Sequence, residues 1–275
     1  MAPTISDRRT MAGASLAAVA ADGWAVTGVP LRRLYAVFVV MFAILAVVAV
    51  IGYRAHPRPG NDFFAFDSFS RFIHSHRPAT IYDQDLLRRF QGMPQHKLFA
   101  FMYHPGMMLL LWPLADLPYQ IGYALWIGVG LVACCIAVAG TSTGWPLALL
   151  VLVAPSTLWT GLCGQSSLLV AALLVEGLAL SPRRPLLGGM LLGLATYKPQ
   201  LGLLVPVALV AAGRWRAMFA AAATGLCIVL FSTLAFGADV WPAWFHHLSS
   251  IIEIRTVHRT DWACLLYTSP SPRDS

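Results

Sequence analysis

Long uninterrupted runs of apolar residues constrain this chain more than any other feature of its sequence. Seven runs are expected to cross a membrane, at residues 34–53, 119–140, 145–162, 166–181, 186–198, 200–213 and 217–236. Hydrophobic residues make up 58% of the 275 residues and charged residues only 11%, whereas about a quarter of a soluble protein is charged. Because a chain in hydrocarbon must satisfy its own backbone hydrogen bonds, the runs predict an all-α, polytopic transmembrane helical bundle of about seven spans.

The two ends of the sequence are set apart from this bundle. Residues 1–31 carry Arg8 and Arg9 before an alanine-rich stretch and faintly resemble a twin-arginine signal, but the strong apolar run that follows favours a disordered cytoplasmic tail. Residues 264–275 read like a translated sequencing-library adapter, which has no part in a fold. The transmembrane domain is therefore assigned to residues 32–263, and it is expected to be incomplete at its C-terminus.

The spacing of the runs predicts how the bundle is threaded. Residues 54–104 form one long polar loop, which is expected to carry interfacial helices. Residues 105–117 are too short to cross and contain Pro113, so they predict a half-helix or an interfacial helix. The runs at 186–198 and 200–213 are each shorter than the roughly 20 residues of a crossing, and together they fit either two crossings or a re-entrant hairpin.

Basic residues in short loops set the predicted orientation. The positive-inside rule holds best for short loops, so Arg183-Arg184 and Arg214/Arg216 are placed on the cytoplasmic side with the N-terminal tail. The long loop then lies on the extracytoplasmic side, despite its own arginines, because long loops translocate with little regard to charge. The turns at Gln165 and Lys198 fall on that same side.

An acidic cluster opens the long loop just after the first run. Asp62 and Asp67 alternate with aromatic residues, and a carboxylate just outside a membrane suits a general base acting on a sugar or lipid hydroxyl. The alternative is that Asp62 caps an interfacial helix whose aromatic residues lie at the level of the lipid headgroups. From the chemistry alone, the structural alternative is favoured.

Two further polar clusters lie on the predicted extracytoplasmic side. Tyr103 and His104 open the half-helix and suit the binding of a headgroup, or they belong to the aromatic belt at the membrane interface. Lys198 and Gln200 flank a proline turn, and Gln165 occupies a turn of the same side. A compact ammonium beside the bilayer suits a phosphate, unless Lys198 only snorkels to the interface.

Other ionisable residues carry no comparable signal. Glu176 is the one acidic residue well inside an apolar run, and pairing with Arg183 or Arg184 explains it. Histidines such as His246 and His247 lack the spacing of metal ligands, so no metal site is expected. The basic residues are dispersed, which argues against a nucleic-acid partner.

The order of these motifs on a hydrophobic chain resembles the GT-C membrane glycosyltransferases, and specifically glycosyltransferase family 87. The resemblance extends from about residue 60 to residue 250. It rests on Asp62-Phe63, Ile81-Tyr82-Asp83, Tyr103-His104-Pro105, Gly164-Gln165 and the stretch from Gly189 through Lys198-Pro199-Gln200, followed by the basic turn at Arg214. One departure is His104, which stands where the family commonly has the first proline of a Tyr-Pro-Pro run.

The resemblance implies a mannosyltransferase that takes its sugar from polyprenyl-phosphate mannose and passes it, with inversion, to a lipid or glycan acceptor. It implies no cofactor, because the lipid-linked donor is itself the substrate. Asp62 would be the base, with Asp67 as the fallback, and Lys198 would offset charge on the departing phosphate. Gln165 would bind the donor. Tyr103, His104 and Gln200 complete the expected binding site. The protein would lie in a bacterial cytoplasmic membrane with its active site outside the cytoplasm.

Two other functions stay open from the sequence. A lipid flippase or small transporter would line its path with Lys198 and Glu176, but it would also require inverted repeats, and none is detectable. A non-catalytic scaffold or inactive fragment is the second alternative, because the chain is expected to lack its C-terminal part.

Overall fold

The computed structural model describes residues 61–94, 98–140 and 145–257, together with a few isolated positions between 36 and 47. All regular elements within these three ranges are helices, as the apolar runs predict. The predicted N-terminal tail, most of the first span at 34–53 and the adapter-like residues 264–275 lie outside the described residues.

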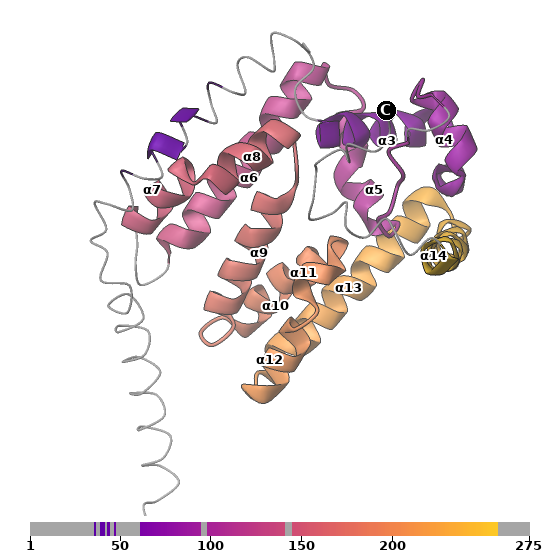
Figure 1. Cartoon of the computed structure of the whole chain (residues 1–275). Coiled ribbons are helices and arrows are strands. Elements are labelled where there is room, and N and C mark those ends of the chain that lie inside the picture. The colour runs from indigo at the N-terminus through magenta and orange to yellow at the C-terminus, as the bar shows by residue number, and fades with distance from the viewer. Residues whose placement is uncertain are drawn as a thin grey trace, which may run out of the picture.

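Figure 1 shows how the helices are arranged. In chain order they are α3 (Asn61–Ser75), η1 (Pro78–Tyr82), α4 (Gln84–Phe90), α5 (Gly106–Leu111), η2 (Trp112–Leu114), α6 (Tyr119–Ala139), α7 (Trp145–Val153), α8 (Pro155–Cys163), α9 (Ser167–Leu180), α10 (Pro185–Leu194), η3 (Ala195–Tyr197), α11 (Pro199–Gly202), α12 (Val205–Ala211), α13 (Trp215–Phe236) and α14 (Val240–Val257). The stretch 105–117, predicted as a half-helix or an interfacial helix, contains the short helices α5 and η2. Helix α14 was not predicted.

Among the described residues, two helices are long and apolar enough to cross a membrane, α6 and α13. The predicted count of seven spans is therefore not supported. Proline interrupts the helices at two places, inside the predicted run at 145–162 and between the predicted runs at 186–198 and 200–213. Ala154 is extended because it precedes Pro155, and this separates α7 from α8. Lys198 likewise leaves the helical conformation before Pro199, so α10 with η3 ends where α11 begins.

The two long helices expose their large apolar side chains and bury their small ones. On α6, Ile121, Val129 and Ile136 are exposed, whereas Gly122 and Gly130 are buried. This is the reverse of a soluble protein, in which large apolar residues fill the core. It fits a helix that faces lipid and packs on its neighbours through small residues.

Close contacts at glycines fix the directions of the central helices. Space beside Gly189 is filled by Ala217 and Ala220, and space beside Gly193 by Ala221 and Thr224. Because the residue numbers of both helices rise in the same direction along the contact, α10 and α13 are parallel. The segment α11–α12 between them must therefore return to the end of the bundle from which α10 starts.

The two basic turns meet at that end. Arg214, at the start of α13, donates to Ser181 Oγ at 2.6 Å and to Leu178 O at 3.5 Å, and both acceptors lie at the end of α9. Arg183-Arg184 follow directly in the chain. The two short loops that were predicted to share one side of the membrane therefore lie together.

A cap of short helices closes the other end of the bundle. It is formed by α3, η1, α4, α5, η2 and α14, which gather beside the far end of α13 (Figure 1). Helix α3 packs into this cap through Phe63, Phe66, Phe69 and Phe72, all buried at a spacing of three residues. The cap thus has an aromatic core, which also packs against residues of α6, α9 and α13.

Candidate active site

A cavity of about 450 Å³ lies between this cap and the end of the helical bundle. Its wall is drawn from α3, the segment 98–104, the turn after η3 and α14. It is lined by Asp62, Ala65, Phe66, Phe69, Leu98, Phe99, Ala100, Met102, Tyr103, His104, Tyr197, Pro199, Gln200 and Trp244. Four of the residues singled out from the sequence, Asp62, Tyr103, His104 and Gln200, therefore line one cavity.

Asp62 reaches the cavity from the first turn of α3. Its neighbour Phe63 is fully buried against Tyr119 and Tyr123 of α6, with ring centroids 5.2 and 5.4 Å apart. This packing fixes the start of α3, and with it the carboxylate. An acidic residue is also favoured there by the positive end of the helix dipole.

Gly164 brings the turn between α8 and α9 against the same point. Its φ of +76° is a left-handed conformation that favours glycine. A Cβ atom at this position would lie 2.5 Å from Phe63 Cβ and 2.9 Å from Phe63 N. The turn that carries Gln165 can approach Asp62 only because residue 164 has no side chain.

Lys198 lies at the same end of the bundle. Its side chain is buried, with 9% exposed, and its Nζ donates to Ser167 Oγ at 3.4 Å. Ser167 in turn donates to Gln165 Oε1 at 3.0 Å. Tyr197 fixes this turn by donating its hydroxyl to Ser166 O at 3.1 Å. The turns at Gln165 and Lys198 are thus joined by direct hydrogen bonds.

The charges of Lys198 and Asp62 interact. Burial lowers the pKa of Lys198, while the negative charge of Asp62 raises it. Lys198 and Gln165 are not among the lining residues. Lys198 lies in the chain between the lining residues Tyr197 and Pro199. Ser167 connects Gln165 to Lys198 by hydrogen bonds to both side chains. The ammonium therefore borders the cavity rather than projecting into it.

Tyr103 contributes a hydroxyl that stays protonated. Burial, with a smaller contribution from the charge of Asp62, raises the pKa of Tyr103 to about 12. At neutral pH the phenol is therefore a hydrogen-bond donor on the cavity wall. Its backbone is held by Tyr82, whose hydroxyl donates to Tyr103 O at 3.0 Å. Of the motif Ile81-Tyr82-Asp83, Asp83 caps α4 by accepting from two backbone N–H groups.

His104 uses both ring nitrogens on backbone groups. Its Nδ1 accepts from the N–H of Gly106 at 3.0 Å, and its Nε2 lies 3.0 Å from Thr196 O. The ring also stacks on Trp241, with centroids 5.9 Å apart. His104 therefore presents ring carbons, rather than a free nitrogen, to the cavity that it lines.

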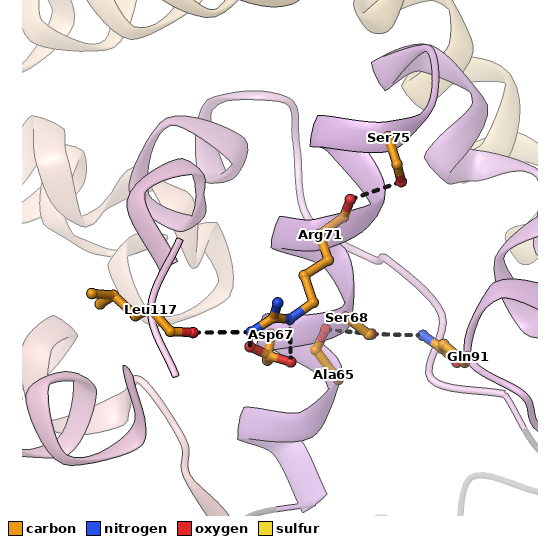
Figure 2. A network of polar contacts seen from close by, with 7 residues as sticks. All are labelled: Ala65, Asp67, Ser68, Arg71, Ser75, Gln91 and Leu117. Atoms are coloured by element: carbon orange, nitrogen blue, oxygen red, sulfur yellow. Dashed lines mark hydrogen bonds and ion pairs between the residues drawn. The ribbon is translucent and has the colours of Figure 1, made fainter. Parts of the chain in front are cut away.

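Asp67, the fallback base, is engaged elsewhere. Figure 2 shows its carboxylate paired with Arg71, whose Nε donates to Asp67 Oδ2 at 3.0 Å and whose Nη2 donates to Leu117 O at 3.0 Å. Asp67 is not among the residues that line the cavity. Its carboxylate orients Arg71, and Arg71 ties α3 to the segment between η2 and α6.

A buried glutamine, Gln91, holds the segment 98–100 that lines one side of the cavity. Gln91 donates from Nε2 to Phe99 O at 2.9 Å and accepts from the N–H of Phe99 through Oε1 at 3.2 Å. Its Nε2 also lies 3.2 Å from Ser68 Oγ of α3, the contact visible in Figure 2. The side chain thus pairs with an extended backbone as a neighbouring strand would.

Sequence reasoning missed Ser167 and Trp244. Ser167 lies two residues after Gln165 at the start of an apolar run, and that placement was a usable signal. Trp244 lies far along the chain on a helix that was not predicted, so its place in the wall required the tertiary structure. Within the described residues, no group of three histidine, cysteine or acidic side chains is arranged to hold a metal ion.

Comparison with known proteins gives one match. The family model of glycosyltransferase family 87 matches residues 101–266, which is more than half of the chain. No curated protein and no solved structure matches it. The matched region includes Tyr103, His104, Gln165, Lys198 and Gln200, whereas α3 with Asp62 precedes it. With apolar, outward-facing helices around this site, the chain belongs to glycosyltransferase family 87 and is a membrane protein.

Proposed function

We propose that the protein transfers a sugar, expected to be mannose, from a polyprenyl-phosphate donor to a hydroxyl of a lipid or glycan acceptor. The observation that carries this proposal is a carboxylate on the wall of a cavity and a buried ammonium at its border, close enough for their charges to interact, from residues 136 positions apart in the sequence. Such a transfer requires a base for the acceptor hydroxyl and a cation for the charge on the departing phosphate.

In the proposed step, Asp62 accepts the proton of the acceptor hydroxyl as its oxygen attacks the anomeric carbon of the sugar. The bond between that carbon and the phosphate oxygen breaks, and the phosphate leaves with the electron pair. Because attack and departure occur on opposite faces, the configuration at the anomeric carbon is inverted. Lys198, on its flexible four-carbon stem, offsets the charge that develops on the phosphate. Tyr103 donates a hydrogen bond to the sugar or its phosphate.

A lipid-linked donor is supported by the surface beside the cavity. Pro199 and Gln200 line the cavity at the start of α11, and the next residues of the chain expose large apolar side chains. Leu203 is 73% exposed and Leu204 is 75% exposed. A polyprenyl chain lying against these leucines would leave its phosphate at the turn that carries Lys198.

The orientation follows from charge. The arginines of the two basic turns lie at the end of the bundle opposite the cavity, and short basic loops favour the cytoplasmic side. We therefore place the cavity on the extracytoplasmic face of a bacterial cytoplasmic membrane. The acceptor, a lipid or glycan, would be met on that face, and no nucleotide-sugar or other cofactor is required there.

The direct test is transfer from a synthetic polyprenyl-phosphate sugar carrying an isotopic label. The full-length protein in vesicles is expected to move the label into a covalent glycoside of inverted anomeric configuration, detected by mass spectrometry and NMR. GDP-mannose alone, without the lipid donor, is the matched control and should give no product. Movement of intact donor between leaflets without a new glycosidic bond would instead identify a flippase.

A further inference from the structure

We propose that His104 is a positioning residue, which holds the turn carrying Lys198 against the cavity and does so only as the neutral tautomer protonated at Nε2. The inference rests on the proposed function for its kinetic consequences. Its structural basis is independent of which sugar or acceptor is used. It replaces a direct role for His104 in binding substrate.

The hydrogen-bond partners of His104 determine its protonation. A carbonyl oxygen can only accept, so the nitrogen 3.0 Å from Thr196 O must carry a proton. A backbone N–H can only donate, so the nitrogen 3.0 Å from the N–H of Gly106 must be unprotonated. Both conditions are met by one form of the ring, the neutral Nε2–H tautomer.

The bridge joins two elements that the chain keeps far apart. Gly106 begins α5, and Thr196 lies in η3, two residues before Lys198. The ring has little room to move, because a Cβ atom on Gly106 would lie only 2.7 Å from His104 Cε1. Trp241 stacks on the ring with an interplanar angle of 16°. A displacement of His104 is therefore passed directly to the turn of Lys198.

Protonation would break the bridge. A proton on Nδ1 would point at the N–H of Gly106. Two donors would then face each other, and the hydrogen bond between them would be lost. Burial lowers the pKa of His104 below its ordinary 6.5, although the hydrogen bond to Thr196 raises it. The ring is thus neutral and the bridge intact above pH 6.5. As the pH falls through this lowered pKa, which lies below 6.5, the ring gains a proton and the bridge is lost.

The groups around His104 come from five parts of the chain. Asp62 of α3 carries a negative charge and Lys198 a positive one, while Tyr103 and Tyr197 are neutral phenols because burial raises the pKa of both. Helix α13 contributes the apolar Ile228. Helix α14 contributes the rings of Trp241 and Trp244.

Two substitutions separate the two hydrogen bonds. His104→Gln keeps an N–H near the Nε2 position and so retains the bond to Thr196. His104→Asn keeps an acceptor near the Nδ1 position but no longer reaches Thr196. At pH 7.5, kcat should stay within about threefold of wild type for His104→Gln and fall about tenfold for His104→Asn. Below pH 6.5 the wild-type rate should drop, and this acid limb should be absent from both variants.

A second readout requires no catalysis. Hydrogen exchange of residues 195–201 at pH 7.5 should be faster in His104→Asn than in wild type and close to wild type in His104→Gln. In wild type, exchange of this segment, corrected for the intrinsic effect of pH, should rise between pH 7.5 and 5.5, whereas α9 should not change. His246→Gln, which replaces an exposed histidine of α14, is the matched control for both readouts.

The outcomes separate this inference from the proposed function. Equal behaviour of the two variants in both readouts, or a fall in rate between pH 7.5 and 5.5 that is as large in His104→Gln as in wild type, overturns the positioning role even if transfer is observed. Absence of transfer in wild type overturns the proposed function, and hydrogen exchange then still decides the role of His104. If His104→Asn does not fold, the wild-type exchange at the two pH values decides it.

Discussion

Replacing Asp62 by asparagine is expected to reduce sugar transfer by about 10³-fold while leaving the protein folded and inserted in the membrane. Asparagine has nearly the shape of aspartate but cannot accept the proton of the acceptor hydroxyl. The side chain lies at the cavity and not within the aromatic core, so its replacement removes no packing. The measurement is the initial rate of transfer from the labelled lipid donor, with thermal stability in detergent recorded alongside.

Asp67→Asn is the matched control, because it makes the same chemical change five residues further along α3. This substitution removes the pairing with Arg71, a partly exposed ion pair that contributes little to stability. We expect at most a small loss of stability and a transfer rate within about threefold of wild type. The opposite ranking, with Asp67→Asn inactive and Asp62→Asn active, would transfer the role of base to Asp67.

Replacing Lys198 by methionine is expected to lower kcat by about 10²-fold, since one fixed donor to the developing charge is lost. Methionine keeps the length of the side chain and suits its buried site. The effect should fall mainly on kcat, because the charge on the phosphate is greatest as the sugar departs. Burial lowers the pKa of Lys198 below the ordinary lysine value of 10.5. In wild type, transfer should therefore decline with rising pH at a pH below 10.5, as Lys198 loses its proton.

Arg77→Met is the control for this loss of a cation. Arg77 lies outside the cavity, and its side chain is 81% exposed in an ion pair with Asp239. Exposed pairs of this kind contribute about 0–1 kcal/mol, so transfer should be nearly unchanged. If Lys198→Met transferred sugar at the wild-type rate, a direct role of the ammonium in the reaction would be excluded.

Much of the site could be predicted because it depends on local chemistry. Asp62 lies a few residues after the first apolar run, and Lys198 precedes a proline that ends a helix, so both were expected outside the apolar runs. The side of each turn followed from counting crossings between basic loops. The hydrogen bonds between Lys198, Ser167 and Tyr197 agree with that placement of the turns.

Other features could not be predicted because they depend on contacts between distant residues. The pairing of Asp67 with Arg71 is a local pattern. The hydrogen bond from Arg71 to Leu117 O and the position of Asp67 outside the cavity could be seen only in the folded structure. Both nitrogens of His104 are occupied by backbone groups, and no sequence pattern predicts that. The predicted count of seven spans is not confirmed among the described residues, and apolar content alone does not report where a proline such as Pro155 ends a helix.

The most direct test of the central claim is to measure the pKa of Lys198 by NMR of isotopically labelled lysine. Lys97 and Lys198 are the two lysines of this sequence, so the signal can be assigned with a Lys97→Arg variant. If Asp62 and Lys198 share one cavity, Asp62→Asn will lower the pKa of Lys198, and Asp67→Asn will change it less. An unchanged pKa in Asp62→Asn would contradict the claim that the two residues act on the same substrate.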